Sequence, residues 1–406
     1  MTSKNVAAEG GRAGRLLVSV ACVAAGIMIA LDRGFYVRIA NDVFFSILMA
    51  SAAIVVVHVR PWREVWQLAV GFGVLVAGQG FVLRAPIRAA PAGAALGIAS
   101  FVLLGLRRIW SVQPEEKNLL RLGLLPPLLL VLLGYFSSGL LASTGELHPK
   151  TLDLYLYAFD GSLGMQPSFA AGRVVLGSLW LTRMCLFWYR ILPAVLMLVY
   201  AQQLIRRGKA ALSVFLAFFL AGPVGIIFYN LFPACGPIYL FPQFPSDPMT
   251  AVQVRALLLQ PVLVTGNRNA FPSLHMAWAL LAWWYGEGLS PWVRTLVVLF
   301  LAGTVLATLG LGEHYFIDLV AAFPFALMMY AACTGGIPLG DRRRFLTLLS
   351  ALLGLTAWMG MLRFGTEIMR LSPLAPWALV ACTVACCIVW QARLPAIERA
   401  VEAGPP

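Results

Sequence analysis

Long hydrophobic runs separated by short polar or basic stretches extend from Leu16 to Trp390. A helix that crosses a bilayer needs about 20 mostly apolar residues, because its backbone polar groups must bond to one another. Apolar runs in soluble proteins are interrupted more often. The pattern therefore predicts an all-α, polytopic membrane protein with about twelve transmembrane helices. The expected spans lie near residues 16–31, 43–59, 65–83, 91–106, 119–141, 186–205, 210–231, 272–286, 292–311, 314–333, 345–363 and 374–392.

Two segments need a separate interpretation. The first run follows Arg12 and Arg15 and resembles a signal peptide, but no small-residue cleavage site follows it, so we expect a retained first span. The segment 174–184 is apolar but too short to cross a bilayer. We expect it to form a short re-entrant or interfacial helix.

Composition and charge agree with a bilayer environment. Hydrophobic residues make up 60% of the chain and charged residues only 12%, about half the share of soluble domains. The net charge of +13 comes from basic clusters between apolar runs, such as Arg206-Arg207-Gly208-Lys209 and Arg342–Arg344. Such clusters are typical of cytoplasmic loops and not of a nucleic-acid site, so we expect the lipid bilayer as partner and no nucleic acid.

The basic clusters also predict an orientation. With the N-terminus in the cytoplasm, most of them face the cytoplasm, and the two long loops near 142–185 and 232–271 lie outside. The Ala-, Gly- and Arg-rich composition favours a bacterial inner (plasma) membrane. The sequence carries no signal for the oligomeric state.

Two of the four histidines begin expected spans on that outer side. His275 follows Pro272 and Ser273 at a predicted helix start, where unpaired N–H groups favour a phosphate. The Ser273 hydroxyl and the guanidinium of Arg268 add donors suited to phosphate oxygens. This segment predicts a phosphate site.

His314 lies four residues before Asp318, so a helix would place the two side chains on one face. A carboxylate on one imidazole nitrogen fixes the tautomer and leaves the other nitrogen free to act as a nucleophile. A structural helix end or a metal ligand would also suit the pair alone. No third ligand lies near it in sequence, so we expect no metal and no cofactor.

These motifs resemble the type 2 phosphatidic acid phosphatase superfamily. Pro272-Ser273-Leu274-His275 and His314-Tyr315-Phe316-Ile317-Asp318 are similar to its second and third signature motifs. The residues of these two motifs, together with the segments 152–164 and 229–237, are similar to the aureobasidin-resistance branch of inositolphosphotransferases. The resemblance covers about 119–335. It implies a six-helix catalytic core there, a four-span N-terminal region at 1–118 and a two-span C-terminal region at 336–406.

The resemblance also implies roles for residues. His314 would attack phosphorus and become phosphohistidine, Asp318 would orient it, and His275 would protonate the departing oxygen and later serve as base. Ser273 and Arg268 would hold the phosphate, and Tyr229, from the branch's variant of the first motif, would bind beside them. Metal-independent turnover is expected.

The chain departs from the superfamily's common pattern in two motifs. The first motif lacks its lysine and Arg-Pro pair, and the third has Ala307 and Thr308 in place of Ser-Arg. Fewer phosphate-binding cations favour a phosphodiester with less charge, and so transfer over monoester hydrolysis.

Three functions therefore compete. The first is a membrane lipid phosphotransferase that moves a phosphate headgroup, with inositol phosphate as a candidate, between lipid and alcohol; Tyr155, Tyr157, Asp160 and Tyr229 are candidates for a polyol pocket. The second is a lipid phosphate phosphatase that hydrolyses phosphatidic acid or polyprenyl phosphate. The third is a transporter or flippase, whose helix mouths would bind an anion.

Overall fold

The computed structural model describes residues 42–60, 65–83, 89–369 and 372–403, and the expected first span at 16–31 lies outside them. The described chain is mostly helical with almost no sheet, which confirms the all-α polytopic prediction. Its elements are α3 (Val43–Ala50), α4 (Ala52–Val59), α5 (Val65–Leu83), α6 (Ala89–Trp110), α7 (Pro114–Leu147), β1 (Lys150–Thr151), α8 (Asp153–Ser162), α9 (Pro167–Leu176), α10 (Leu179–Arg190), α11 (Leu192–Arg207), η2 (Gly208–Ala211), α12 (Leu212–Leu231), α13 (Pro237–Leu240), α14 (Ala251–Ala256), β2 (Val262–Leu263), α15 (Leu274–Tyr285), α16 (Pro291–Gly310), α17 (Phe316–Cys333), α18 (Arg342–Gly360), η3 (Met361–Gly365), α19 (Thr366–Met369) and α20 (Leu374–Ala403).

Seven helical stretches among the described residues are long and apolar enough to cross a membrane. One of them, Leu192–Leu231, comprises α11 and α12 with the η2 turn between them. The others are Ala90–Trp110, Pro114–Leu147, Pro291–Gly310, Phe316–Cys333, Arg342–Gly365 and Leu374–Leu394. The expected span at 65–83 coincides with the bounds of α5. The expected spans at 43–59 and 272–286 correspond to shorter helices, because α3 and α4 meet at Ser51 and α15 has 12 residues.

The segment before α11 differs from the sequence expectation. The span expected at 186–205 begins only at Leu192, because α10 ends at Arg190. Before it, α9 and α10 are bent against each other by 116° at the break between Leu176 and Leu179. A bent pair of this kind is a broken span or a re-entrant loop, and it includes the 174–184 segment that the sequence predicts to be re-entrant or interfacial.

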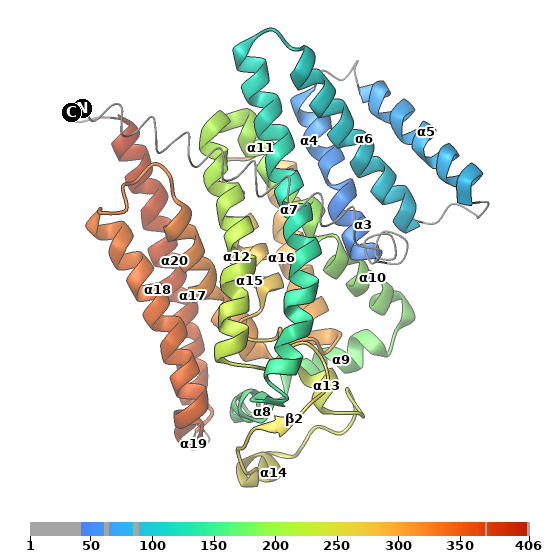
Figure 1. Ribbon diagram of the computed structural model, residues 1–406. Coiled ribbons are helices and arrows are strands. Elements are labelled where there is room, and N and C mark those ends of the chain that lie inside the picture. The colour runs from blue at the N-terminus through green and yellow to red at the C-terminus, as the bar shows by residue number, and fades with distance from the viewer. Residues whose placement is uncertain (1–41, 61–64, 84–88, 370–371, 404–406) are drawn as a thin grey trace.

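The helices form one bundle with a central and two flanking groups (Figure 1). Helices α7, α12, α15 and α16 occupy the centre, α17, α18 and α20 lie on one side, and α3 to α6 on the other. In the apolar stretch of α17, 83% of the residues are buried, against 22% in the stretch Leu374–Leu394 of α20. Helix α17 is therefore buried between the central helices α12 and α15 and the outer helices α18 and α20, whereas α20 presents most of its surface to the surroundings.

The loops that carry the candidate site meet at one end of this bundle. Helices α8, α13 and α14 and strand β2 gather there, and α7, α12 and α16 end there, while α15 and α17 begin there (Figure 1). Strand β1 pairs with β2 in antiparallel register, with Lys150 opposite Leu263 and Thr151 opposite Val262. This pairing ties the loop after α7 to the loop before α15.

Candidate active site

His314 lies in the short connection between α16 and α17, and its backbone is fixed from two sides. The carbonyl of Thr308 accepts hydrogen bonds from the N–H groups of Glu313 at 3.1 Å and of His314 at 3.2 Å. On the other side, Oγ of Ser168 in α9 donates to the His314 carbonyl at 2.8 Å. The backbone that carries the His314 imidazole is therefore held in place by hydrogen bonds on both sides.

Contacts of the His314 ring define which nitrogen carries the proton. Nδ1 lies 3.0 Å from the carbonyl oxygen of Ala270 and 3.5 Å from Oδ2 of Asp318. A carbonyl can only accept a hydrogen bond, so Nδ1 carries the proton and the Nε2 lone pair is free. Burial lowers the pKa of His314 to about 4, against smaller raising effects of Glu313 and the Ala270 carbonyl. The ring is therefore neutral at pH 7, as a nucleophile must be.

Asp318 is fully buried in the first turn of α17. Its Oδ2 accepts the N–H of Tyr315 at 2.8 Å and lies beside His314, as the four-residue spacing predicts. Its Oδ1 has no hydrogen-bond partner among the described residues. The carboxylate thus joins the start of α17 to the His314 ring, while Ala270 supplies the closer acceptor.

His275 lies in the first turn of α15 and is held by aromatic rings. Its imidazole stacks on Tyr189 of α10, with ring centroids 3.7 Å apart and an interplanar angle of 25°. Trp278 meets it edge-on at 6.4 Å. Within the described part of the chain, its buried Nε2 atom has no hydrogen-bond partner. An unpaired buried polar atom costs roughly 1–3 kcal/mol, so this nitrogen is suited to a partner on a bound molecule.

Both histidines line the same cavity, which has a volume of about 180 Å³. Tyr229 of α12 and Asn269 contribute further polar groups to its wall. The structure thus brings together three of the residues predicted from sequence, His275, His314 and Tyr229. Asp318 adjoins the cavity through its contact with the His314 ring.

Arg268, a predicted phosphate ligand, lies in the loops beside the cavity. Its side chain is only 2% exposed and does not line the cavity. The guanidinium donates to backbone carbonyls and to a thiol of the surrounding loops: His148 at 2.7 Å, Val264 at 2.9 Å, Pro149 at 3.1 Å, Gly266, and Sγ of Cys235 at 3.2 Å. In this structure Arg268 fastens the loop before α15 to the loop after α7.

Ser273 is the N-cap of α15, as the sequence predicts. Its hydroxyl oxygen accepts the N–H of Met276 at 3.4 Å, and its own N–H donates to the Asp318 carbonyl at 3.1 Å. Ser273 is fully buried and is not among the cavity-lining residues. It links the start of α15, with His275, to the start of α17, next to His314.

Two further buried carboxylates hold the loops around His314. In α8, Asp160 accepts the N–H of Phe316 at 2.7 Å and of Ile317 at 3.1 Å, and so satisfies the open first turn of α17. Asp153, at the start of α8, accepts the N–H of Gly236 at 2.8 Å. Burial raises the pKa of both carboxyl groups. The sequence signals these two positions only as acidic residues in a mostly apolar chain. Their roles could not be predicted, because their hydrogen-bond partners lie 83 to 157 residues away in sequence.

A close backbone approach explains one glycine in this network. Gly236 has φ of +108°, and a Cβ atom there would lie 2.3 Å from the carbonyl oxygen of Glu313. A side chain is therefore excluded by both conformation and space. The loop after α12 packs directly on the residue that precedes His314.

Three of the four residues expected to form a polyol pocket lie in α8, away from the cavity lining. Of the four, only Tyr229 lines the cavity. The Tyr157 hydroxyl accepts the N–H of Met249 at 2.7 Å, and the Tyr155 ring lies 4.7 Å from the guanidinium of Arg363 in η3. The carboxylate of Asp160 accepts hydrogen bonds from the first turn of α17. In the part of the chain that the structure describes, no group of three His, Cys, Asp or Glu residues is placed to hold a metal ion.

One family model matches part of the chain. Residues 154–332 match the family model described as the PAP2 superfamily. The match supports the type 2 phosphatidic acid phosphatase superfamily, and with it a membrane enzyme of phosphatase or phosphotransferase type that acts on lipid phosphates. Neither the curated proteins nor the solved structures gave a match.

Proposed function

We propose that this protein is a membrane lipid phosphotransferase of the inositolphosphotransferase kind, which works through a phosphohistidine on His314. The observation that carries the proposal is the shared cavity: His275 and His314 line it together, and the His314 ring presents a free Nε2 lone pair. A nucleophile oriented by its neighbours beside a second acid–base group is the arrangement that covalent group transfer requires.

In the first half-reaction, Nε2 of His314 attacks phosphorus and the P–O bond to the lipid alcohol breaks. His275 gives a proton to the departing oxygen. In the second half-reaction, the acceptor hydroxyl attacks the phosphohistidine, the P–N bond breaks, and His275 takes the hydroxyl proton. Asp318 and the Ala270 carbonyl stabilise the His314 ring while it carries positive charge.

The environment of the phosphate favours a substrate with low charge. Thr308 is buried and its hydroxyl donates to the Thr304 carbonyl at 2.7 Å, so no cation lies at this place of the third motif. Asn269 and Tyr229 line the cavity together with the two histidines. Direct phosphate binding by Ser273 and Arg268 stays a prediction, and in this proposal both residues also hold the loop that presents His275.

The positions of the basic residues favour an extracytoplasmic site in a bacterial inner membrane. Helices α12 and α16 end at the site, so the basic clusters near their starts, Arg206–Lys209 and Arg294, belong to the opposite end of the bundle (Figure 1). Arg342–Arg344 follow the end of α17 that is remote from the site. Such clusters remain on the cytoplasmic side.

The test is an assay of the purified protein with a headgroup-labelled phospholipid, with and without inositol, ceramide or diacylglycerol. We expect labelled transfer product only when an acceptor is present, and none with His314→Ala or His275→Ala. Label released at the same rate with and without acceptor would make the protein a lipid phosphate phosphatase. Lipid or solute translocation that survives His314→Ala would instead favour a transporter.

A further inference from the structure

The cavity that holds the two histidines continues away from them between the helices. On α7 its wall consists of Leu130, Leu133, Gly134, Ser137 and Leu141. These positions are spaced by three and four residues, so they form one face of the helix. Opposite walls come from α11 and α12, through side chains such as Leu196 and Ile226.

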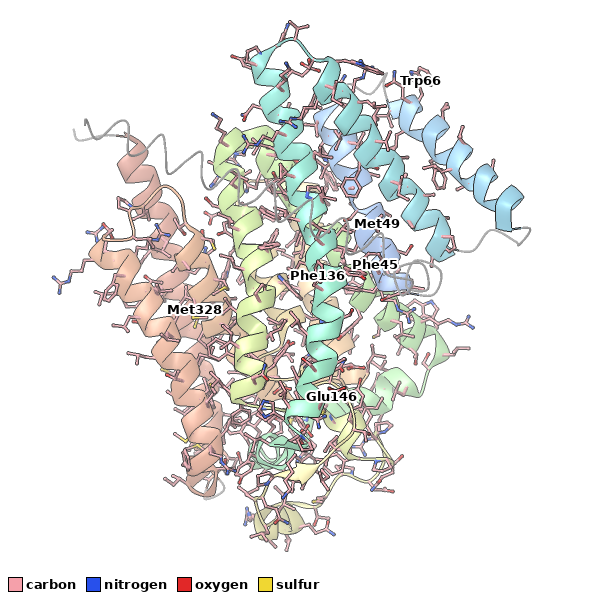
Figure 2. The ribbon with its side chains drawn as sticks, viewed as in Figure 1. Phe45, Met49, Trp66, Phe136, Glu146 and Met328 are labelled. Atoms are coloured by element: carbon pink, nitrogen blue, oxygen red, sulfur yellow. The ribbon has the colours of Figure 1, made fainter. Side chains whose placement is uncertain are left out.

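The length of the α7 wall is informative. From Leu130 to Leu141 the helix rises by about 16 Å, at 1.5 Å per residue. This is about half of a hydrocarbon core about 30 Å thick, and so the depth of one leaflet. The end near Leu141 lies toward the C-terminal end of α7, at the site end of the bundle, where Glu146 is labelled in Figure 2.

Helix α3 closes the same cavity with Phe44 and Leu48. Figure 2 shows that α3 lies against α7, with Phe45 and Met49 of α3 near Phe136 of α7, and these residues belong to one apolar cluster. Both helices precede residue 154, where the PAP2 match begins. The N-terminal part of the chain thus contributes directly to the cavity of the matched segment.

We propose that the wall formed by α3 and α7 is a binding subsite for a hydrocarbon chain of the donor lipid. The subsite rests on the proposed function, since that function places the donor's phosphate at the histidines. A lipid with its phosphate there must direct its chain along the apolar walls, parallel to the helices. A chain that fits the space between these walls makes van der Waals contacts along its length, so this wall selects donors by the length and shape of their chain.

Leu48 and Gly134, which face each other, set the width of the subsite. A Cβ atom on Gly134 would lie 2.4 Å from Cδ2 of Leu48, so the Leu48 side chain fills the space that Gly134 leaves open. Leu48 is 7% exposed and lines the cavity. Truncation of Leu48 widens the subsite, and a large side chain at Ser137 fills it.

The experiment compares donors that share a headgroup and differ in chain length. Ser137→Phe is paired with Leu140→Phe, because Leu140 lies on the same helix but is 52% exposed and does not line the cavity. With Ser137→Phe we expect kcat/KM for a long-chain donor to fall roughly tenfold or more relative to a short-chain, water-soluble donor. Leu140→Phe should leave this ratio unchanged, and Leu48→Ala should shift preference toward a bulkier, branched chain.

A second measurement does not depend on turnover. The wild-type protein is illuminated with a phospholipid that carries a diazirine in its chain, and the labelled peptides are mapped. Label on α3 and α7, competed by unlabelled long-chain donor, supports the subsite. Label confined to other helices, or chain-length ratios that are the same in Ser137→Phe and wild type, would overturn it. A protein that is labelled on α3 and α7 but turns over no phospholipid would disprove the proposed function and would show only that this wall binds a lipid chain.

Discussion

Replacement of Asp160 by asparagine tests whether α8 positions His314. The two carboxylate oxygens of Asp160 accept the N–H groups of Phe316 and Ile317, two and three residues after His314. Asparagine has the same shape but only one accepting oxygen, and its NH₂ group would face an N–H donor. One buried donor in the first turn of α17 is then left unpaired, at a cost of roughly 1–3 kcal/mol.

This free-energy cost lowers the catalytic rate if the first turn of α17 shifts to relieve it and moves the His314 ring. Each 1.36 kcal/mol in a barrier is a factor of ten in rate, so kcat/KM should fall by roughly 5- to 150-fold. The assay is donor turnover by detergent-purified Asp160→Asn, beside its thermal unfolding. Asp247→Asn is the matched control, because Asp247 is exposed and its backbone has φ of 47°, which asparagine tolerates.

Asp247→Asn should behave like the wild type in both measurements. The positioning role of Asp160 would be refuted if Asp160→Asn were properly folded and kept wild-type kcat/KM. A destabilised variant with unchanged kcat/KM would also refute it, since Asp160 would then support the fold without directing the His314 ring.

The remaining predictions concern the other contacts of the two histidines. Gly236→Ala would place a Cβ atom against the Glu313 carbonyl, so we expect turnover to fall at least tenfold; wild-type turnover would contradict the tight packing of the two loops. Tyr189→Leu should lower kcat through loss of the ring stacked on His275, whereas Tyr189→Phe, which keeps the ring, should retain most activity. Equal kcat in the two variants would argue against the stack. Since burial lowers the pKa of His314 from 6.5 to about 4, the unfolded chain binds more protons between these values, and stability is lost as pH falls through 6.5 toward 4. At pH 5 this loss is roughly 2 kcal/mol, so the unfolding midpoint should fall more from pH 7 to pH 5 in the wild type than in His314→Asn, and parallel curves would contradict it.

Much of the fold follows from the apolar pattern, because a bilayer span leaves a long and simple signal. The expected spans at 292–311 and 314–333 agree closely with α16 and α17. The start of α11 was misplaced, because the apolar run continues through α10 and only the backbone break after Arg190 separates them. Hydrophobicity alone does not indicate where a helix bends.

The site was predictable where its signal was local. The four-residue spacing predicts that His314 and Asp318 lie close together, and their side chains are 3.5 Å apart although His314 precedes α17. The helix start expected at Ser273 agrees with the N-cap of α15. The burial of the Arg268 side chain was not predictable, because most of its acceptors are backbone carbonyls, two of them in a loop about 120 residues earlier. Backbone acceptors have no sequence signature.

The same limit applies to the acceptor for Nδ1 of His314. The sequence points to Asp318, but the closer oxygen is the carbonyl of Ala270, which any residue would supply. The contribution of α3 and α7 to the cavity was also not predictable, because the apolar residues that line a site have the same sequence pattern as an ordinary membrane helix.

The central claim is that His314 accepts the phosphate covalently, and trapping the intermediate tests it most directly. Purified protein is mixed with phosphate-labelled donor lipid without acceptor, quenched in alkali and digested, and the labelled peptide is mapped. We predict an acid-labile, alkali-stable label on His314 that is absent in His314→Ala and is discharged when the acceptor is added. Full transfer activity without any label on His314, or a label that persists in His314→Ala, would contradict the account.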